Sequence, residues 1–404
     1  MRILFISTET RPMIGGIANC LDSWLSGIAE NDLDVCMLGL LPHELIDKVK
    51  LLHSRPYREE WCFLEERKPQ FLDGLALFRK FNSGIFLIRQ SWAVGQKYRK
   101  LAKDFQPDWV VFSVLNPVCC IPLSVAYHSG KPCAAIAYGS EINPVRVSNP
   151  SWLKRTLKKF NKVVVISEFT RRLVELWGVR SGNIAIVHPG LSPDFVESSS
   201  QSRKMKEEIL SQKEFHLLTI CRLVERKGVQ TVIYAVRQLC DQGIPVFYDI
   251  VGDGPYRSVL ENMAEELDLQ NVVKFWGVAD DHKREELLAD CDIFVMVPFE
   301  DQRGDVEGFG IVYLEAGWFG KPVIGSWSGG VADAVKHEET GLLVQPENSK
   351  DLFSTIQNLI NHLQQQERLG QNGNQWALLH SPKKVGKQFI EVLYIERLAY
   401  RAMC

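Results

Sequence analysis

Apolar and polar positions alternate along this chain in a way that predicts parallel β-sheets covered by helices. Short apolar runs rich in Val and Ile recur throughout, and amphipathic stretches of helical period separate them. Strands joined by crossover helices produce this pattern. The predicted strands are Ile3–Ser7, Val35–Leu40, Val110–Leu115, Cys133–Ala137, Val163–Ile166 and Ile184–His188, followed by residues 217–221, 246–251, 272–275, 293–297, 322–324 and 342–344.

The two groups of strands predict two doubly wound α/β domains. A chain of 404 residues exceeds what one hydrophobic core usually supports. We assign residues 1–195 to the first domain and 196–384 to the second, with a linker at Ser192–Glu214 that includes the polar run Ser198–Ser202. Ligands bind beyond the carboxyl ends of such strands, so two domains face to face are predicted to enclose a cleft.

The segment Trp109–Gly130 is the one candidate for a membrane span, because it contains no Asp, Glu, Lys or Arg. Asn116, Pro117 and Pro122 interrupt it. We therefore interpret it as a buried strand, a turn and a helix. The first apolar run of the chain turns polar at Thr8, which makes it too short for a secretory signal peptide.

Composition points to globular, water-facing domains, with 46% hydrophobic and 24% charged residues. Residues 1–195 hold 25 Lys and Arg against 18 Asp and Glu, and the remainder holds 22 against 31, so the halves carry +7 and −9. The 10 cysteines form no Cys-x-x-Cys pair and no cluster with metal-ligand spacing. Reduced thiols and a cytoplasmic location are the expectation.

Candidate chemistry centres on the stretch Glu307–Glu315, which places two carboxylates around a glycine-interrupted helix start. The first turn of a helix presents unpaired N–H groups and partial positive charge, and Gly308 and Gly310 let an anion approach it. A diphosphate fits such a site, with hydroxyl groups on the two carboxylates. A plain surface helix with a Glu at each end is the alternative.

A pair of cations precedes this stretch by about 80 residues. Arg222 and Lys227 follow the strand 217–221, and Gly228 comes before a helix that begins near Val229. Arg offers a forked donor and Lys a point charge, which together suit a departing diphosphate. A solvated loop is the alternative for this pair taken alone.

The order of these motifs resembles the retaining glycosyltransferases of family 4. The resemblance covers almost all of residues 214–348 and is weaker in the amino-terminal half. The motifs that carry it are Pro189–Phe195, Arg222 with Lys227, Ile250–Pro255, Phe275–Val278, Glu307–Glu315, Gly325–Gly330 and Glu339–Val344, with Gly15, Gly16 and Tyr138–Glu141 in the first half.

That resemblance implies the GT-B fold, with two Rossmann-like domains facing across a cleft and the final helix, residues 385–404, crossing back onto the first domain. It implies metal-independent hexosyl transfer with retention, and no cofactor besides the nucleotide sugar donor, for which we prefer UDP-glucose. The implied catalytic residues are Arg222, Lys227, Glu307 and Tyr138. The implied donor-binding residues are Gly15, Gly16, Arg222, Lys227, Gly252, Trp276, Val278, Glu307, Gly308, Phe309, Gly310, Ile311 and Glu315.

In the family, Glu307 would bind hexose hydroxyls, Glu315 the ribose hydroxyls, and Phe275–Val278 would flank the base. One departure stands at Tyr138, because many members have His ahead of the Gly-x-Glu motif. A Tyr can donate to a hexose hydroxyl, but with a pKa near ~10 it cannot act as an imidazolium. Ordinary packing is the alternative for Tyr138, and Glu141 is the neighbouring polar candidate.

Two other motifs suggest chemistry that we do not favour. Asp290-Cys-Asp292 has the Asp-x-Asp form of metal-dependent glycosyltransferases, but it lies between a predicted helix and a strand, where it fits a structural cap. We therefore predict no metal site. Gly252-Asp-Gly254 lacks the third glycine of a dinucleotide-binding loop, which Arg257 replaces, so a dehydrogenase is not expected.

The segment 146–180 carries nine basic residues against two acidic, with Trp152 among them. A basic helix with an aromatic residue could hold the enzyme at the inner face of a membrane, next to a lipid-linked acceptor. A solvated positive face is the alternative. Nucleic-acid binding is not expected, because the total charge is −2 and no recognition motif is present.

Taken together, the sequence predicts a hexosyltransferase that uses a nucleotide diphosphate sugar and a glycan or lipid-linked acceptor. One alternative is a catalytically impaired nucleotide-sugar-binding subunit of a glycosyltransferase complex, motivated by Tyr138. Another is a different sugar–phosphate reaction, such as phosphorolysis. The acceptor itself is not encoded in a recognisable motif, since its contacts are expected around residues 42–70 and 79–100.

Overall fold

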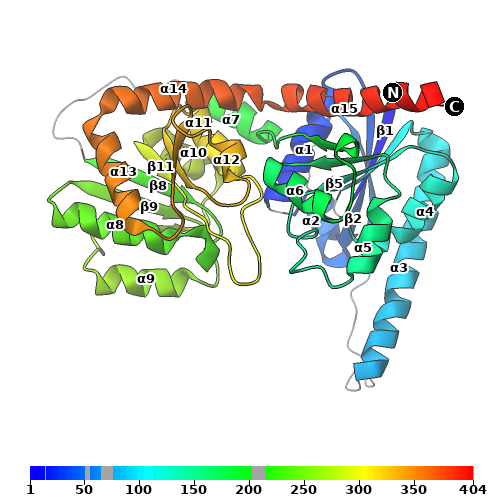
Figure 1. Ribbon diagram of the computed structural model, residues 1–404, viewed down its shortest axis with the longest axis horizontal. Helices are drawn as coiled ribbons and strands as arrows, with labels where there is room; N and C mark the ends of the chain where they lie inside the picture. The colour runs from blue at the N-terminus through cyan, green and yellow to red at the C-terminus, as the bar shows by residue number, and fades with distance from the viewer. Residues whose placement is uncertain (14, 51–54, 65–75, 114, 203–213, 404) are drawn as a thin grey trace. The chain divides into compact units, whose positions relative to one another are not determined.

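The computed structural model describes residues 1–13, 15–50, 55–64, 76–113, 115–202 and 214–403. The chain divides into two compact units (Figure 1). The first unit comprises Met1–Gly190 together with Pro382–Cys404, and the second comprises Leu191–Ser381. Parts of the expected linker (203–213) and of the expected acceptor loops (51–54 and 65–75) lie outside the described residues.

The first unit is built on a parallel sheet of seven strands in its described part, in the order β3-β2-β1-β4-β5-β6-β7. Strands β1, β4 and β5 are buried along almost their whole length, so they contain near-continuous apolar runs. The strands are β1 (Arg2–Ser7), β2 (Asp34–Pro42), β3 (Arg58–Leu64), β4 (Trp109–Ser113), β5 (Cys133–Ala137), β6 (Lys162–Val165) and β7 (Ile184–Ile186).

Helices cover both faces of this sheet, and the last helix of the chain packs against the first. Cβ atoms at Gly27 and Gly386 would each clash with backbone of the opposite helix, so these glycines permit the close approach. Phe389 contacts the rings of Phe5 and Trp24. The helices are α1 (Gly16–Ala29), α2 (Ile46–Lys50), α3 (Ala76–Phe105), α4 (Cys120–His128), α5 (Pro150–Leu157), α6 (Glu168–Leu176) and α15 (Pro382–Met403), with 3-10 turns η1 (His43–Leu45), η3 (Pro117–Cys119) and η4 (Ser181–Asn183).

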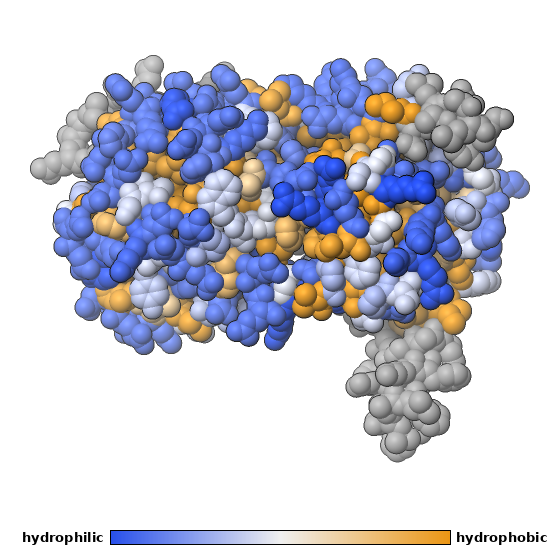
Figure 2. All heavy atoms as spheres, viewed as in Figure 1, coloured by the Kyte–Doolittle hydropathy of each residue, from blue (hydrophilic) through white to orange (hydrophobic). Residues whose placement is uncertain are grey.

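The second unit repeats the architecture with six parallel strands in its described part, in the order β10-β9-β8-β11-β12-β13. The strands are β8 (Phe215–Ile220), β9 (Val246–Val251), β10 (Val273–Gly277), β11 (Ile293–Val295), β12 (Val323–Ser326) and β13 (Gly341–Val344). The helices are α7 (Pro193–Ser202), α8 (Val229–Asp241), α9 (Arg257–Glu266), α10 (Asp281–Asp290), α11 (Ile311–Trp318), α12 (Val331–Ala334), α13 (Ser349–Asn361) and α14 (Leu363–Leu379), with η5 (Glu225–Lys227). The face of this unit seen in Figure 2 is mostly hydrophilic, as expected when apolar side chains fill the core.

Each strand order reverses at one point, and these points lie where sheets of this kind bind ligands. In the first unit the reversal lies between β1 and β4, and in the second between β8 and β11. The loops after β8 and β11 therefore emerge side by side, although about 80 residues separate them in sequence. Phe299 N–H donates to the Arg226 carbonyl at 2.9 Å and ties the two loops together.

The twelve strands predicted from apolar runs are all present, and two parallel-sheet domains are confirmed. Strand β3 was not predicted, because Arg58–Leu64 is half-buried and polar at its start. The predicted polar linker at Ser198–Ser202 is wrong, since these residues form the end of helix α7. Polar composition there reflects hydrogen bonding: Ser198 donates to the Glu285 carboxylate.

The uncharged segment Trp109–Gly130 is a strand and a short helix inside the first unit, β4 and α4. Among the described residues, no helix combines the length and the apolar composition needed to span a bilayer.

Candidate functional site

The second unit brings Lys227 and Glu307 together at the point where its strand order reverses. Lys227 ends the turn η5 after β8, and Glu307 lies in the loop after β11. The Lys227 ammonium donates to Glu307 Oε2, and both side chains are mostly buried, with 14% and 15% exposed. The two residues named from separate motifs thus form one site.

Arg226 and Asp305 complete this charged cluster. Arg226 Nε lies 3.1 Å from Asp305 Oδ2, and Arg226 Nη1 lies 3.6 Å from Glu307 Oε2. Burial alone raises the pKa of Glu307, but Lys227 and Arg226 outweigh it, so the pKa of this carboxyl lies below its ordinary value. Glu307 is therefore an anion at neutral pH, ready to accept hydrogen bonds from neutral donors such as hydroxyls.

Sequence reasoning missed Arg226 and chose Arg222 as the partner of Lys227. Arg222 is exposed, and no ion pair or hydrogen bond to its side chain is found among the described residues. Arg226 was available as a signal in the run Glu225-Arg226-Lys227, where the turn η5 sets the direction of each side chain. Arg222 remains a cation at the carboxyl end of β8 that is open to a ligand.

Helix α11 begins next to Glu307 with the backbone that an anion site needs. Gly310 has φ +93°, and a Cβ there would come within 2.6 Å of the Tyr313 ring, so only glycine fits. Phe309 is buried and contacts the His380 ring, which holds the turn in place. Gly308 and Ile311 are partly exposed, so the first turn of the helix can be reached from solvent.

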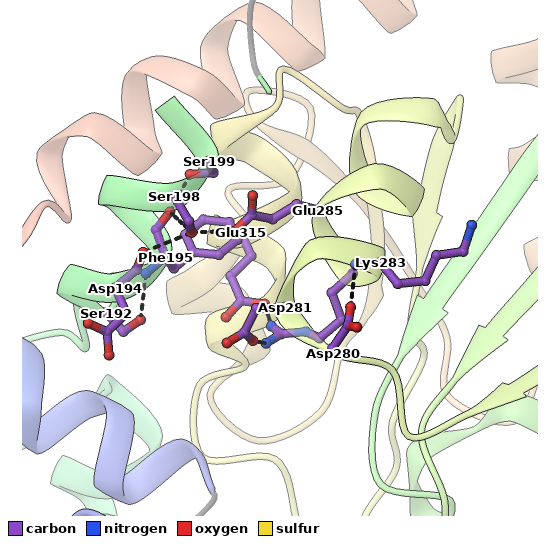
Figure 3. Close-up of polar contacts among 11 residues, drawn as sticks. Ser192, Asp194, Phe195, Ser198, Ser199, Asp280, Asp281, Lys283, Glu285 and Glu315 are labelled. Atoms are coloured by element: carbon purple, nitrogen blue, oxygen red, sulfur yellow. Dashed lines mark hydrogen bonds and ion pairs between the residues drawn. The ribbon is translucent and has the colours of Figure 1, made fainter. Parts of the chain in front are cut away.

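Glu315 lies inside α11 and is 6% exposed. Arg284 of α10 donates to Glu315 Oε2 at 2.8 Å and to Asp281 Oδ1 at 3.1 Å (Figure 3). Sequence reasoning named Glu315 but not Arg284. No motif marks Arg284, because its partner is 31 residues away and on another helix.

Gly252 follows β9 and serves close packing of backbone. It has φ +129°, and a Cβ there would lie 1.8 Å from the Cys221 carbonyl oxygen. The loop of Gly252 thus lies against the end of β8, where Leu223 N–H donates to the Asp253 carbonyl at 3.0 Å. This contact explains the glycine without a ligand and supports the loop that carries Lys227.

Trp276 and Val278, predicted to flank a base, follow one another across Gly277 at the end of β10. Trp276 Nε1 donates to Asp249 at 2.6 Å, and the ammonium groups of Lys274 and Lys283 lie 3.5 and 4.3 Å from the ring centroid. Val278 is 81% exposed. Trp276 is fixed on the sheet, while Val278 is available to a planar ligand.

In the first unit, Gly15 and Gly16 begin helix α1. Both are exposed, and a Cβ at either would meet no atom within 4 Å. Gly15 has φ 162° and provides no side-chain cap. Packing therefore leaves this backbone open to a ligand and gives no independent reason for glycine.

Tyr138 points into the core of the first unit. It is 5% exposed, its hydroxyl lies 2.8 Å from that of Ser113, and its ring stacks on Trp24. Burial raises the pKa of Tyr138 well above its ordinary value. The packing interpretation fits this position, and we leave Tyr138 out of the proposed site.

Glu141, the neighbouring candidate, is bound by backbone. Its carboxylate accepts from Tyr138 N–H at 2.6 Å and from Gly139 N–H at 3.1 Å. Burial raises the pKa of Glu141, and these hydrogen bonds oppose that effect. Its role in the structure is to hold the turn after β5.

The two motifs that suggested other functions have structural roles. Asp292 Oδ2 accepts from His216 N–H at 2.9 Å, so the Asp-x-Asp stretch joins α10 to β11. No group of three or more metal-ligating side chains is found in the described part of the chain. In the basic segment, α5 buries Leu153 and Leu157 while Lys154 and Arg155 are exposed, and Trp152 packs against the core. The solvated positive face is the interpretation that this arrangement favours.

Comparison with known proteins agrees with the site in the second unit. Residues 200–376 match the model for "Glycosyl transferases group 1", and residues 14–195 match that for "Glycosyltransferase Family 4". WcaL of Escherichia coli strain K12, a glycosyltransferase assigned provisionally to colanic acid biosynthesis, is 28% identical over 218 residues. That match covers 53% of this chain and 52% of the relative, so this chain spans about half the length of that protein.

A longer match is the GDP-mannose-dependent α-(1-6)-phosphatidylinositol monomannoside mannosyltransferase of Mycolicibacterium smegmatis, 27% identical, which covers 93% of this chain and 94% of the relative. Among solved structures, HepE of Anabaena in complex with UDP and glucose has a TM-score of 0.70 at 20% identity, covering 98% and 99% of the two chains. Its likeness concerns the fold. Since family models match both domains and each domain is a doubly wound parallel sheet, the chain belongs to glycosyltransferase family 4 and has the GT-B fold.

Proposed function

We propose that this enzyme transfers a hexosyl group from a nucleotide diphosphate hexose to an acceptor hydroxyl, with retention at the anomeric carbon and without a metal ion. The observation that carries the proposal is the joining of Lys227, Arg226 and Glu307 beside the open first turn of α11. It combines cations for a diphosphate with an ionised carboxylate for sugar hydroxyls.

Breaking a glycosyl–phosphate bond leaves negative charge on the departing diphosphate, which the site must stabilise. Lys227, Arg226 and Arg222 supply positive charge, and the N–H groups near Gly310 supply the positive end of a helix. One well-placed donor is typically worth about 10²–10³ in rate. These groups account for leaving-group stabilisation by protein atoms alone, which is why we propose metal independence.

Glu307 is proposed to bind hydroxyls of the donor hexose. Its pKa is low, so it is an acceptor across the physiological pH range. Binding of the diphosphate would draw Lys227 away from Glu307 Oε2 and release that oxygen for a hydroxyl. Donor binding and sugar positioning are then coupled through one ion pair.

UDP-glucose is the donor we propose first, and GDP-mannose is the second candidate because the M. smegmatis relative is named for it. The proposed base site after β10 offers backbone and the exposed Val278, which do not select strongly among bases. For the acceptor we propose a glycan or a lipid-linked glycan. The name of WcaL, assigned provisionally to a polysaccharide pathway, supports that class.

The test is a thermal-shift screen against UDP-, GDP- and ADP-hexoses with and without a chelator, followed by an assay for slow donor hydrolysis. We expect stabilisation by one nucleotide class, release of the nucleoside diphosphate, and no effect of the chelator. Stabilisation without turnover over a panel of acceptors would instead favour the nucleotide-sugar-binding subunit, which the buried Tyr138 keeps as an alternative. Loss of turnover with chelator would overturn metal independence.

A further inference from the structure

The carboxylate of Glu315 is held on one side only. Arg284 Nη2 donates to Oε2 at 2.8 Å, whereas Oε1 accepts no hydrogen bond from any described residue. The side chain is 8% exposed, so its charge needs a partner inside the protein. One oxygen is thus fixed and the other is available to a ligand.

Arg284 is itself placed between two carboxylates. Its second terminal nitrogen donates to Asp281 Oδ1 at 3.1 Å, and Asp281 is 80% exposed. The nearby Glu315 carboxylate is the main reason that the pKa of Arg284 lies above its ordinary value. The planar guanidinium therefore fixes the angle of the Glu315 carboxylate, which a single point charge would not do.

Helix α10, which carries Arg284, is anchored at several points along its length. Asp280 caps the helix by accepting from Lys283 N–H at 2.8 Å, and Glu285 accepts from Ser198 of α7 (Figure 3). Near the other end, Lys321 donates to the Ala289 carbonyl at 2.7 Å. Arg284 consequently extends from a fixed backbone towards Glu315.

We propose that Arg284 is a positioning residue that orients the Glu315 carboxylate for the vicinal hydroxyls of the donor ribose, and so sets the preference for ribonucleotide over 2′-deoxyribonucleotide donors. This inference rests on the proposed function. A diol can donate two hydrogen bonds to one carboxylate only if the carboxylate plane faces it. Arg284 fixes that plane, and the free Oε1 accepts one of the two hydroxyls.

The experiment compares binding of UDP and 2′-deoxy-UDP, and of GDP and 2′-deoxy-GDP, by calorimetry. We expect the unmodified protein to bind its preferred ribonucleotide at least about 10-fold more tightly than the deoxy form, as a hydrogen bond to a charged group allows. In Arg284→Met this ratio should fall below about 3-fold, because binding of the ribonucleotide weakens while that of the deoxy form is unchanged. Arg237→Met, which removes a paired Arg from the outer helix α8, is the control and should keep the full ratio.

Arg284→Lys is the second variant, for use if the Met variant does not fold. It keeps the charge but loses the fork, so the ratio should fall to an intermediate value. A full ratio in either Arg284 variant that folds overturns the inference and leaves the proposed function intact. Equal affinity for ribo and deoxy forms in the unmodified protein also overturns it, and absence of all nucleotide binding overturns the proposed function with it.

Discussion

The two domains share a topology but use the ends of their strands differently. In the first, the polar side chains after β5 bind inward: Tyr138 to Ser113, and Glu141 to backbone N–H groups. In the second, the loops after β8 and β11 hold Arg226, Lys227, Asp305 and Glu307 as charged groups at the surface of the sheet. A buried neutral hydroxyl stabilises a fold, whereas partly exposed charges can exchange partners with a ligand.

The comparison teaches that position after a strand does not make a residue functional. Both Tyr138 and Lys227 follow strands of a doubly wound sheet, in motifs that resemble the same family. They differ in where the side chain points and in what already satisfies it. Substitution at each should therefore affect different properties, activity in one case and stability in the other.

The largest expected effect is on activity, from Lys227→Ala. Removing this donor should lower kcat/KM for hexosyl transfer by about 10²–10³, because the leaving diphosphate loses its nearest cation. Steady-state kinetics with the donor identified by the thermal-shift screen measures this loss. Lys350→Ala, which alters an exposed lysine of α13 in the same domain, is the control and should change little.

Folding of the Lys227→Ala variant is checked by its thermal unfolding. Arg226 still lies 3.6 Å from Glu307, so the carboxylate keeps a positive neighbour and the domain should remain folded. Turnover within about 3-fold of the unmodified enzyme in a folded variant would sink the diphosphate role of Lys227, since one donor of this kind is worth far more.

A contrasting effect on stability is expected from Tyr138→Phe. The Ser113 hydroxyl would lose its partner inside the core, which should lower the free energy of unfolding by about 1–3 kcal/mol. Activity should remain within about 2-fold, because no transition-state interaction is removed. Denaturant unfolding and kinetics on the same preparation measure both quantities.

The double substitution Ser113→Ala with Tyr138→Phe sharpens this comparison. Because both partners of the hydrogen bond are then removed, the pair should cost less than the two single changes added together. A loss of activity of 100-fold or so in Tyr138→Phe at unchanged stability would contradict the packing role and return Tyr138 to the active site.

The smallest expected effect concerns His216, near the amino end of β8. The Asp249 carboxylate, 3.9 Å from Nδ1, is the main reason that the pKa of His216 lies above its ordinary value. A raised pKa in the folded state stabilises the protein below the unfolded value of about 6.5, and the gain is lost as pH rises through the folded value. The difference in Tm between the unmodified protein and His216→Gln should therefore be larger near pH ~5.5 than near pH ~8.5. An equal difference at both pH values would contradict this coupling.

Much of the fold could be predicted because buried parallel strands are written as apolar runs. Strand β3 could not, since its start at Arg58 and Glu60 pairs with charged neighbours at the edge of the sheet. Helix α7 was mistaken for a linker because its serines are satisfied by partners distant in sequence. Apolar periodicity reports burial, and it is silent where polar groups are bonded within the structure.

The sequence by itself determined two doubly wound domains and brought Lys227, Glu307 and Glu315 to notice through their motifs. Only the tertiary structure decided that Arg226 rather than Arg222 reaches Glu307, that Arg284 binds Glu315, and that Tyr138 faces the core. The physical reason is the strand order: β8 lies beside β11, so residues about 80 apart meet. Which charge pairs with which then depends on side-chain direction within a turn or a helix, and no spacing in the sequence encodes that across two elements.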